Sequence, residues 1–290
     1  MLRISSPQEM LRWSREHRCA GRSVGLVPTM GYLHEGHLRL IDRVRSDADV
    51  TVVSVFVNPT QFGPDEDLLT YPRDLDRDTA LISARGGDCV FAPETVDMYP
   101  SDPMVRVTPG DLAAHLCGPN RPGHFEGVLT IVAKLFNVVE PDVAVFGRKD
   151  AQQARMIATM SRELDFPIRV VVVPTVREPD RVAMSSRNSY LSTEERTAAT
   201  QIPISLDTAH REFTSGSVGV EALLATTREV LNHSPLIEIE YVEAVDPDRM
   251  APVAVLGHDT ILAVAVRLGK ARLIDNIVLG QGLDADDVTG

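Results

Sequence analysis

Residues 51–57 read Thr51-Val52-Val53-Ser54-Val55-Phe56-Val57, a β-branched run that is typical of a strand buried inside a parallel sheet. Similar but shorter apolar runs recur along the first 175 residues, and amphipathic stretches separate them. The predicted strands cover residues 23–27, 51–57, 89–92, 143–146 and 168–173. The predicted helices cover residues 7–17, 75–84, 128–139 and 151–164, with one more that carries Leu38, Ile41 and Val44 on one face. This alternation predicts an α/β fold with a parallel sheet and helices on both faces.

The sequence pattern changes after Pro174. Two helical stretches, 193–213 and 218–231, precede strand-like runs at 237–245, 261–268 and 271–278. Gly269-Lys270 joins the last two runs and indicates a hairpin. We therefore expect residues 1–175 to form one domain and residues 176–290 to form a smaller α+β domain with an antiparallel sheet. The acidic tail from Gly282 is expected to fray.

Composition excludes several classes of protein. The chain is 43% hydrophobic and 24% charged, which argues against disorder, and its net charge of −12 argues against a general binder of nucleic acid or anionic membranes. The cysteines, Cys19, Cys89 and Cys117, are odd in number and far apart, and no CxxC or Cys/His cluster appears, which argues against a disulfide framework or a structural zinc site. Neither a signal peptide nor a membrane span is recognisable, so we expect a protein of the reducing cytoplasm.

The most informative segment runs from the first long strand into a helix: Pro28-Thr29-Met30-Gly31-Tyr32-Leu33-His34-Glu35-Gly36-His37. Backbone N–H groups at a helix N-terminus favour an anion such as phosphate, and the two glycines allow a nucleotide to approach closely. His34 and His37 are three residues apart and can both donate to one phosphate, whereas a zinc-protease motif needs a spacing of four. The alternative interpretation is a pair of surface histidines that cap the helix.

Two further segments carry groups suited to phosphate. Phe146 to Asp150 ends a strand and opens a helix, and it places Lys149 beside a carboxylate that can accept Mg²⁺. Met184-Ser185-Ser186-Arg187 offers two hydroxyls and a guanidinium that can grip phosphate oxygens from a mobile loop. Taken separately, the first is equally compatible with a polar loop and a capping Asp, and the second with an ordinary turn.

A fourth segment ends the strand quoted first. In Phe56-Val57-Asn58-Pro59-Thr60-Gln61-Phe62, the amides of Asn58 and Gln61 suit the hydroxyl or carboxylate groups of a small polar substrate. The basic residues Arg73, Arg121 and His124 lie near loops, where we expect them to be solvated.

Five segments together resemble one family in sequence and in order. They are PTMGYLHEGH (28–37), FVNPTQF (56–62), GRKDAQQ (147–153), PTVREPDRVAMSSRN (174–188) and RLIDNI (272–277), and the family is pantothenate synthetase (pantoate–β-alanine ligase). The resemblance covers residues 23 to 279. The paired histidines and the MSSR segment also resemble the HIGH and KMSKS signatures of class I aminoacyl-tRNA synthetases.

The resemblance implies a Rossmann-like N-terminal domain that binds ATP and pantoate, and a C-terminal domain that closes over the active site. It implies that pantoate attacks the α-phosphorus of ATP, that pyrophosphate leaves, and that β-alanine then displaces AMP from pantoyl adenylate. The implied ATP site consists of Met30, Gly31, Tyr32, Leu33, His34, Glu35, Gly36, His37, Gly147, Arg148, Lys149, Asp150, Val176, Met184, Ser185, Ser186 and Arg187. The implied catalytic residues are His37, His34 and Lys149, and Gln61 and Gln153 would bind pantoate and β-alanine with Asn58 and Tyr71 in support.

Two positions depart from the family pattern: Arg148 stands where Glu is commonest, and Arg181 stands where Gly is common. The resemblance implies ATP as substrate with Mg²⁺, for which no protein ligand is assigned, and a homodimer formed through the N-terminal domain. Another adenylyltransferase with the HxGH motif is the main alternative, although it would lack FVNPTQF and the second domain. A tRNA-binding relative is the other alternative, and the acidic balance argues against it.

Overall fold

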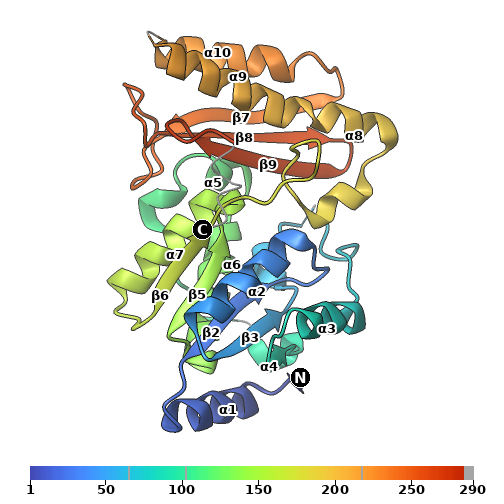
Figure 1. Cartoon of the computed structure of the whole chain (residues 1–290), viewed down its shortest axis with the longest axis vertical. Helices are drawn as coiled ribbons and strands as arrows, with labels where there is room; N and C mark the ends of the chain where they lie inside the picture. Colours follow the sequence, from blue (N-terminus) through green and yellow to red (C-terminus); the bar gives the residue numbers. More distant parts are fainter. Residues whose placement is uncertain (65, 102, 217, 284–290) are drawn as a thin grey trace. The chain divides into compact units, whose positions relative to one another are not determined.

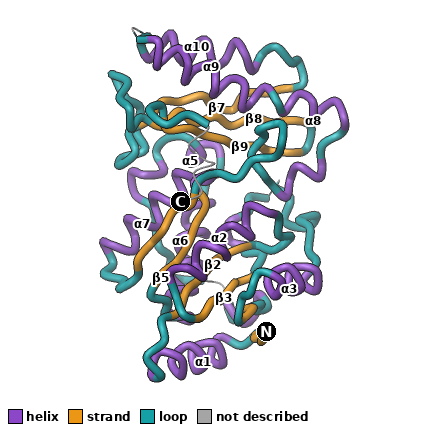
Figure 2. Tube along the Cα trace, viewed as in Figure 1, coloured by secondary structure: helices purple, strands orange, loops and turns teal. Residues whose placement is uncertain are grey.

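A computed structural model of the chain describes residues 1–64, 66–101, 103–216 and 218–283 (Figures 1 and 2). The chain divides into two compact units, neither of which is continuous in sequence. Unit 1 consists of Met1–Pro109, Arg121–Arg148 and Gln153–Val173, and unit 2 consists of Gly110–Asn120, Lys149–Gln152 and Pro174–Gly290. The tail that we expect to fray lies almost entirely outside the described residues.

Unit 1 is built on a parallel sheet of six strands within the described residues, in the order β1-β4-β3-β2-β5-β6. The strands are β1 (Leu2–Ile4), β2 (Val24–Thr29), β3 (Val50–Val55), β4 (Cys89–Phe91), β5 (Val143–Gly147) and β6 (Arg169–Val173). The helices around it are α1 (Pro7–Cys19), α2 (Glu35–Asp47), α3 (Leu75–Ala84), α4 (Thr95–Met98), α6 (His124–Val139) and α7 (Ala151–Glu163). The predicted α/β class with a parallel sheet is confirmed.

Both faces of this sheet are covered. Val27 and Val53 pack with Ile41 and Val44 of α2 in one apolar cluster, while the alternate strand residues Leu26 and Val52 are equally buried and point to the opposite face. Gly25 allows α2 to lie close to β2, because a Cβ there would come within 2.3 Å of Val44 Cγ2. The close contact fixes where the short loop between β2 and α2 must run.

The predicted element ends differ from the observed ones where local signals conflict. Strand β2 continues through Pro28, which pairs in register with Ser54, although proline usually ends a strand. Helix α6 begins at His124, before the predicted start at Val128, because Gly127 lies inside the helix rather than in a loop. The short strand β1 was not predicted.

Unit 2 is built on an antiparallel sheet of three strands within the described residues, β7 (Ile237–Val245), β8 (Ile261–Leu268) and β9 (Ala271–Val278). Its longer helices are α8 (Thr193–Ala199), α9 (Gln201–Ser215) and α10 (Val220–Leu231), and α5 (Cys117–Asn120) also belongs to it. The antiparallel sheet and its hairpin at Gly269 are confirmed. The predicted helix 193–213 is interrupted at Thr200, because Pro203 has no N–H to donate to the carbonyl of Ala199.

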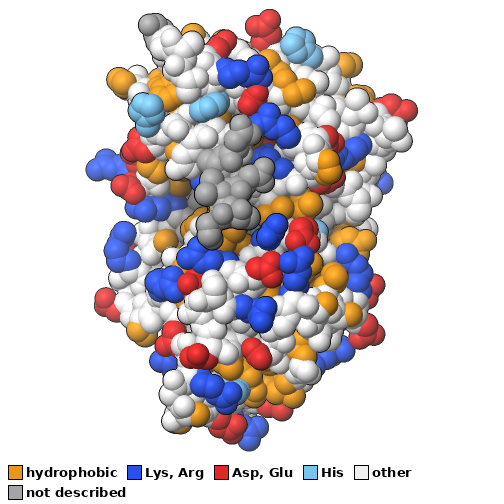
Figure 3. Space-filling model, in the orientation of Figure 1, with side chains coloured by type: hydrophobic (Ala, Val, Ile, Leu, Met, Phe, Trp, Pro, Cys, Tyr) orange, Lys and Arg blue, Asp and Glu red, His pale blue; other side chains and the backbone are white. Residues whose placement is uncertain are grey.

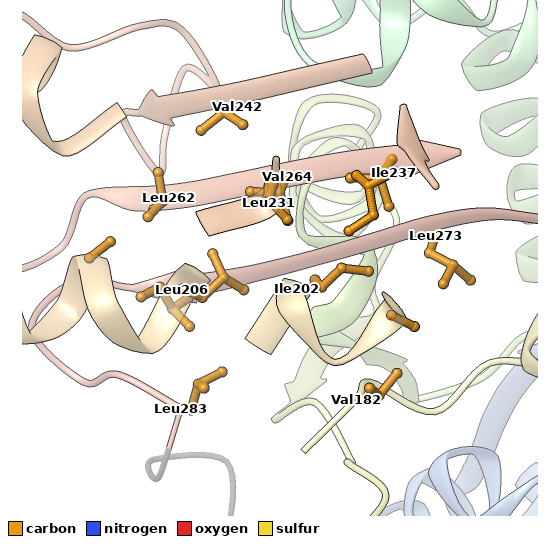
Figure 4. Close-up of a cluster of buried hydrophobic side chains, with 14 of the residues drawn as sticks. Val182, Ile202, Leu206, Leu231, Ile237, Val242, Leu262, Val264, Leu273 and Leu283 are labelled. Carbon is orange, nitrogen blue, oxygen red and sulfur yellow. The ribbon is translucent and has the colours of Figure 1, made fainter. Parts of the chain in front are cut away.

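One apolar cluster fills the space between these helices and the sheet. Figure 4 shows Ile202 and Leu206 of α9 facing Leu262, Val264 and Leu273 of the sheet. Val182, from a loop before α8, belongs to the same cluster.

Acidic and basic side chains are interspersed over the face of the molecule shown in Figure 3. In the described part of the chain, each helix is too short or too polar to span a bilayer.

Candidate active site

The carboxyl ends of three neighbouring strands carry most of the predicted site residues of unit 1. Met30 follows β2, Phe56 to Gln61 follow β3, and Gly147 ends β5. Because β3, β2 and β5 are adjacent and parallel, these segments leave the same edge of the sheet. This is the edge at which open α/β sheets bind ligands.

A buried carboxylate shapes the loop between β2 and α2. The Asp78 carboxylate, from α3, accepts hydrogen bonds from Tyr32 N at 2.7 Å and from Leu33 N at 2.8 Å. Burial raises the pKa of Asp78 despite these donors and despite Arg77. Arg77 donates to Leu33 O at 3.0 Å and lies over the Tyr32 ring. Sequence reasoning missed Asp78, because nothing local distinguishes it from the neighbouring acidic residues of α3.

The N–H groups of the loop before α2 have partners within the protein. Those of Tyr32 and Leu33 point to Asp78, and that of Gly31 donates to Thr29 Oγ1 at 3.1 Å. The predicted anion site concerns the N–H groups of the helix N-terminus itself, which follows this loop, and it stays a prediction. Gly31 has φ +84°, and a Cβ there would lie 3.0 Å from Asp78 Oδ2. The glycine is therefore required by the turn and its carboxylate, whether or not a nucleotide approaches.

The two histidines lie side by side at the start of α2. His34 is the N-cap residue, and its backbone N–H donates to His37 Nδ1 at 3.3 Å. Their ring centroids are 4.0 Å apart. Glu35 and Gly36 form the first helical turn beside them, where the helix dipole favours negative charge.

Gln61 connects two of the predicted segments of unit 1, residues 28–37 and residues 56–62. Its side chain donates through Nε2 to Met30 Sδ at 3.0 Å and accepts at Oε1 from Asn58 Nδ2 at 3.1 Å. Asn58 is buried, and its amide also bonds Gly127 O of α6, Thr60 Oγ1 and Tyr99 OH. Asn58 thus holds Gln61 in place through neutral hydrogen bonds. Tyr71, also predicted, is buried against the Phe62 ring.

Arg121 and His124 were predicted to be solvated, but they belong to a partly buried hydrogen-bond network that contacts the backbone carbonyl of Gln61. Arg121 pairs with Glu66 through two contacts of 2.6 Å and donates to His124 Nε2 at 2.8 Å. His124 Nδ1 then donates to Gln61 O at 2.7 Å, which assigns the neutral ring. Burial opposes ionisation of Glu66, but Arg121 outweighs it, and the pKa of Glu66 is lowered. Sequence spacing could not show this, because Glu66 and Arg121 are far apart in the chain.

The remaining predicted residues of unit 1 lie on β5 and α7. Gly147 pairs with Val173, and a Cβ there would meet open space. Arg148 follows it and opens the 3₁₀ turn Arg148–Asp150 (η3). Gln153 is half-buried in the first turn of α7.

Unit 2 holds Lys149 and Asp150 with Val176 and the Met184 to Arg187 segment. Lys149 Nζ donates to Met184 O at 2.8 Å, so two of the predicted segments are in direct contact. Ser185 caps the 3₁₀ turn Ser186–Tyr190 (η4) by accepting from Arg187 N at 3.3 Å. Burial lowers the pKa of Lys149, although Asp150 and Asp275 oppose this shift.

No group of three or more His, Cys, Asp or Glu suited to a metal ion occurs among the residues that the structure describes. An ion that arrives with ATP needs only one or two carboxylates beside the phosphates, so this finding concerns a resident metal site and not the predicted Mg²⁺.

The sequence matches a known family over almost its whole length: residues 3–278 match the family described as pantoate-beta-alanine ligase. A pantothenate synthetase of Heliobacterium modesticaldum is 50% identical over 276 residues, covering 95% of this chain and 98% of that protein. The pantothenate synthetase of Fervidobacterium nodosum is 48% identical, with the same coverage of 95% and 98%.

Solved structures agree with the sequence matches. The crystal structure of pantothenate synthetase from Thermus thermophilus has a TM-score of 0.89 and 44% identity, and the match covers 96% of this chain and 99% of that one. Pantoate-beta-alanine ligase from Francisella tularensis, complexed with beta-gamma ATP and beta-alanine, has a TM-score of 0.79 and 31% identity, with coverage of 98% and 99%.

Proposed function

Because this chain belongs to the pantoate–β-alanine ligase family, it is a ligase that condenses pantoate with β-alanine, and we propose that the reaction runs through pantoyl adenylate. A carboxylate is a poor electrophile, so activation must come first. A pantoate carboxylate oxygen attacks the α-phosphorus of ATP, and the bond to the β-phosphate breaks and releases pyrophosphate. The β-alanine amine then attacks the acyl carbon, loses a proton, and displaces AMP.

One observation carries this proposal: the contact between Gln61 and Met30. It joins the segment proposed to hold the nucleotide to the neutral amides proposed to hold the acyl group. In this proposal Gln61 and Gln153 bind pantoate and β-alanine, supported by Asn58 and Tyr71. An acyl pocket lined with neutral amides can orient a carboxylate without fixing it in an ion pair, so the carboxylate remains a nucleophile.

The cationic and polar groups of the proposed ATP site stabilise the negative charge that develops on the phosphates. His37 and His34 at the N-terminus of α2 are suited to the developing charge at phosphorus. Lys149 and the segment Ser185 to Arg187 are suited to the departing pyrophosphate. The other members of the proposed site are Met30, Gly31, Tyr32, Leu33, Glu35, Gly36, Gly147, Arg148, Asp150, Val176 and Met184.

We propose that Mg²⁺ enters with ATP and is held by phosphate oxygens, which are ligands that this ion prefers. No protein ligand is assigned to the ion, and no catalytic step is routed through it. We also propose, from the family resemblance, a cytoplasmic homodimer formed through the N-terminal domain, and a C-terminal domain that closes over the bound nucleotide. Light scattering that gives the mass of a single chain would contradict the dimer.

Exchange of pyrophosphate tests the first step by itself. With Mg²⁺ and pantoate present and β-alanine absent, labelled pyrophosphate should enter ATP, because formation of an acyl adenylate is reversible and needs no amine. Adding β-alanine should then yield AMP. ADP as the nucleotide product would indicate attack at the γ-phosphorus and would overturn the mechanism. Exchange supported by nicotinate mononucleotide or by an amino acid in place of pantoate would overturn the substrate.

A further inference from the structure

Strand β9 carries two consecutive buried polar residues that have no role in the proposed reaction. Asp275 is 2% exposed and Asn276 is 4% exposed, and both lie in the RLIDNI segment. Strand β9 is at the edge of its sheet, bonded to β8 alone among the described strands. Successive side chains of a strand point to opposite faces of the sheet. The side chains of Asp275 and Asn276 can therefore contact two different segments of the chain.

Asp275 holds a small hairpin that precedes the MSSR segment. Arg177 donates to the Asp275 carboxylate through Nη1 at 2.6 Å and Nη2 at 3.0 Å, and both side chains are buried. Arg177 also donates to Arg181 O at 3.1 Å and forms an antiparallel bridge with Ala183. The ion pair therefore fixes residues 177–183 against the strand.

Two more contacts fix the hairpin. Met184 N donates to Val176 O at 3.0 Å, which closes its base. The Val182 side chain lies in the apolar cluster of unit 2 (Figure 4). Met184 thus starts the MSSR segment from an anchored position.

Asn276 connects Lys149 to strand β9, and Lys149 in turn contacts the end of the hairpin. Its Nδ2 donates to Lys149 O at 2.9 Å, and Lys149 Nζ donates to Met184 O. A closed path of contacts therefore runs from β9 through the hairpin to Met184, then through Lys149 back to β9. Every member of this path belongs to unit 2.

We propose that Asp275 and Asn276 are positioning residues, which hold Lys149 and the MSSR segment in one arrangement before ATP binds. The inference rests on the proposed function, because the roles of Lys149 and of that segment in binding ATP are themselves proposed. If Lys149 and the MSSR segment are already ordered before ATP binds, less conformational entropy is lost on binding. Breaking a contact of the path should therefore lower kcat/KM for ATP. The use of pantoate should change little.

Asn276→Ala provides the first test, with Asn137→Ala as its matched control. Asn137 also donates its Nδ2 to a backbone carbonyl, that of Ala133 at 3.0 Å, but it lies on α6 of unit 1. We expect Asn276→Ala to lower kcat/KM for ATP about fivefold to tenfold in the exchange assay, which is the effect of one lost hydrogen bond. The KM for pantoate should stay within about twofold, and Asn137→Ala should change neither value.

Amine labelling provides a readout that does not depend on activity. The chain has three lysines, so Lys134 and Lys270 serve as internal references for Lys149 when the labelled peptides are quantified by mass spectrometry. Burial lowers the pKa of Lys149, while Asp150 and Asp275 raise it and Arg187 and Arg177 lower it. Asp275→Asn removes one of the favourable charges, so the pKa of Lys149 should fall further and the neutral amine should label severalfold faster. Protection of the Cys117 thiol, buried in unit 2, checks that this unit stays folded.

The outcomes separate the two proposals. Unchanged ATP kinetics in Asn276→Ala, or equal increases of the KM for ATP and for pantoate, would overturn the positioning role. Unchanged Lys149 labelling in a folded Asp275→Asn variant would also overturn it. Absence of pantoate-dependent exchange in the wild-type protein would overturn the proposed function, and the labelling comparison would still decide whether β9 holds Lys149.

Discussion

The two ring nitrogens of His37 have different surroundings. Nδ1 accepts the His34 N–H, so a neutral ring carries its proton on Nε2. An Nε2–H at the start of α2 is suited to donate to a phosphate oxygen. The positive end of the helix dipole favours negative charge at the same place. The backbone contact therefore selects the tautomer that the proposed chemistry needs.

We expect His37→Ala to lower the exchange rate by about a hundredfold or more, the usual cost of removing one donor aimed at developing charge. His37→Gln should retain part of the activity, because its amide N–H can reach toward the same oxygen. His233→Ala, at an exposed histidine, is the control. Near wild-type exchange in a His37→Ala protein with native circular dichroism would remove His37 from the mechanism.

Helix α3 contributes to the site through its buried end rather than through a ligand contact. Asp78 lies in its first turn and accepts both N–H groups that the loop between β2 and α2 presents to it. Position 78 therefore determines the loop that carries Met30 to His34. Each oxygen of its carboxylate accepts one N–H group, whereas an asparagine amide has only one oxygen.

Asp78→Asn should therefore leave one buried N–H group without an acceptor, which costs about 1–3 kcal/mol of the free energy of unfolding. The displaced loop should also lower kcat/KM for ATP. Asp76→Asn, on the exposed face of the same helix, should change neither the urea midpoint nor the kinetics. Equal effects of the two substitutions would show that the loss of charge on α3, not the loop contact, is responsible.

Elements with a strong local signal could be predicted from the sequence. The bounds of α3, β7, β8 and β9 match, because helical periodicity, alternation and the turn at Gly269 agree with one another. Prediction failed where a local signal was misleading, as at Gly127 inside α6 and Pro28 inside β2. There, contacts with neighbouring elements determine the structure.

The family and its ligase activity were predicted from the motifs and are confirmed by the comparisons. The individual roles of the site residues stay predictions. The contacts that Asp78 and Asn276 make could not be predicted, although Asn276 lies in the RLIDNI segment, because their partners are 45 residues or more away in sequence. Hydrogen-bonding partners at that separation leave no periodic pattern.

The division of the chain into discontinuous units also could not be predicted. Segments 110–120 and 149–152 interrupt unit 1 in sequence but belong to unit 2. In the first of these, Leu116 N donates to Glu243 Oε1 at 3.3 Å, and Cys117 Sγ lies 3.2 Å from Arg272 Nη2 and 3.5 Å from Tyr241 OH. A fragment that ends at residue 175 keeps this segment and its hydrogen bonds to Gln152, but it loses Glu243, Tyr241 and Arg272.

Thiol reactivity can test this organisation. In the full chain at pH 8, only Cys19 should react fast, because it is exposed while Cys89 and Cys117 are buried. Burial raises the pKa of Cys89 to about 12, so this thiol supplies almost no thiolate, the reactive form. In fragment 1–175, Cys117 loses Tyr241 and Arg272 and should react fast as well, which gives two fast thiols. One fast thiol would show that residues 110–120 are packed without the rest of unit 2. Three would show that unit 1 does not keep its core when separated, since Cys89 is fully buried in β4, between β1 and β3.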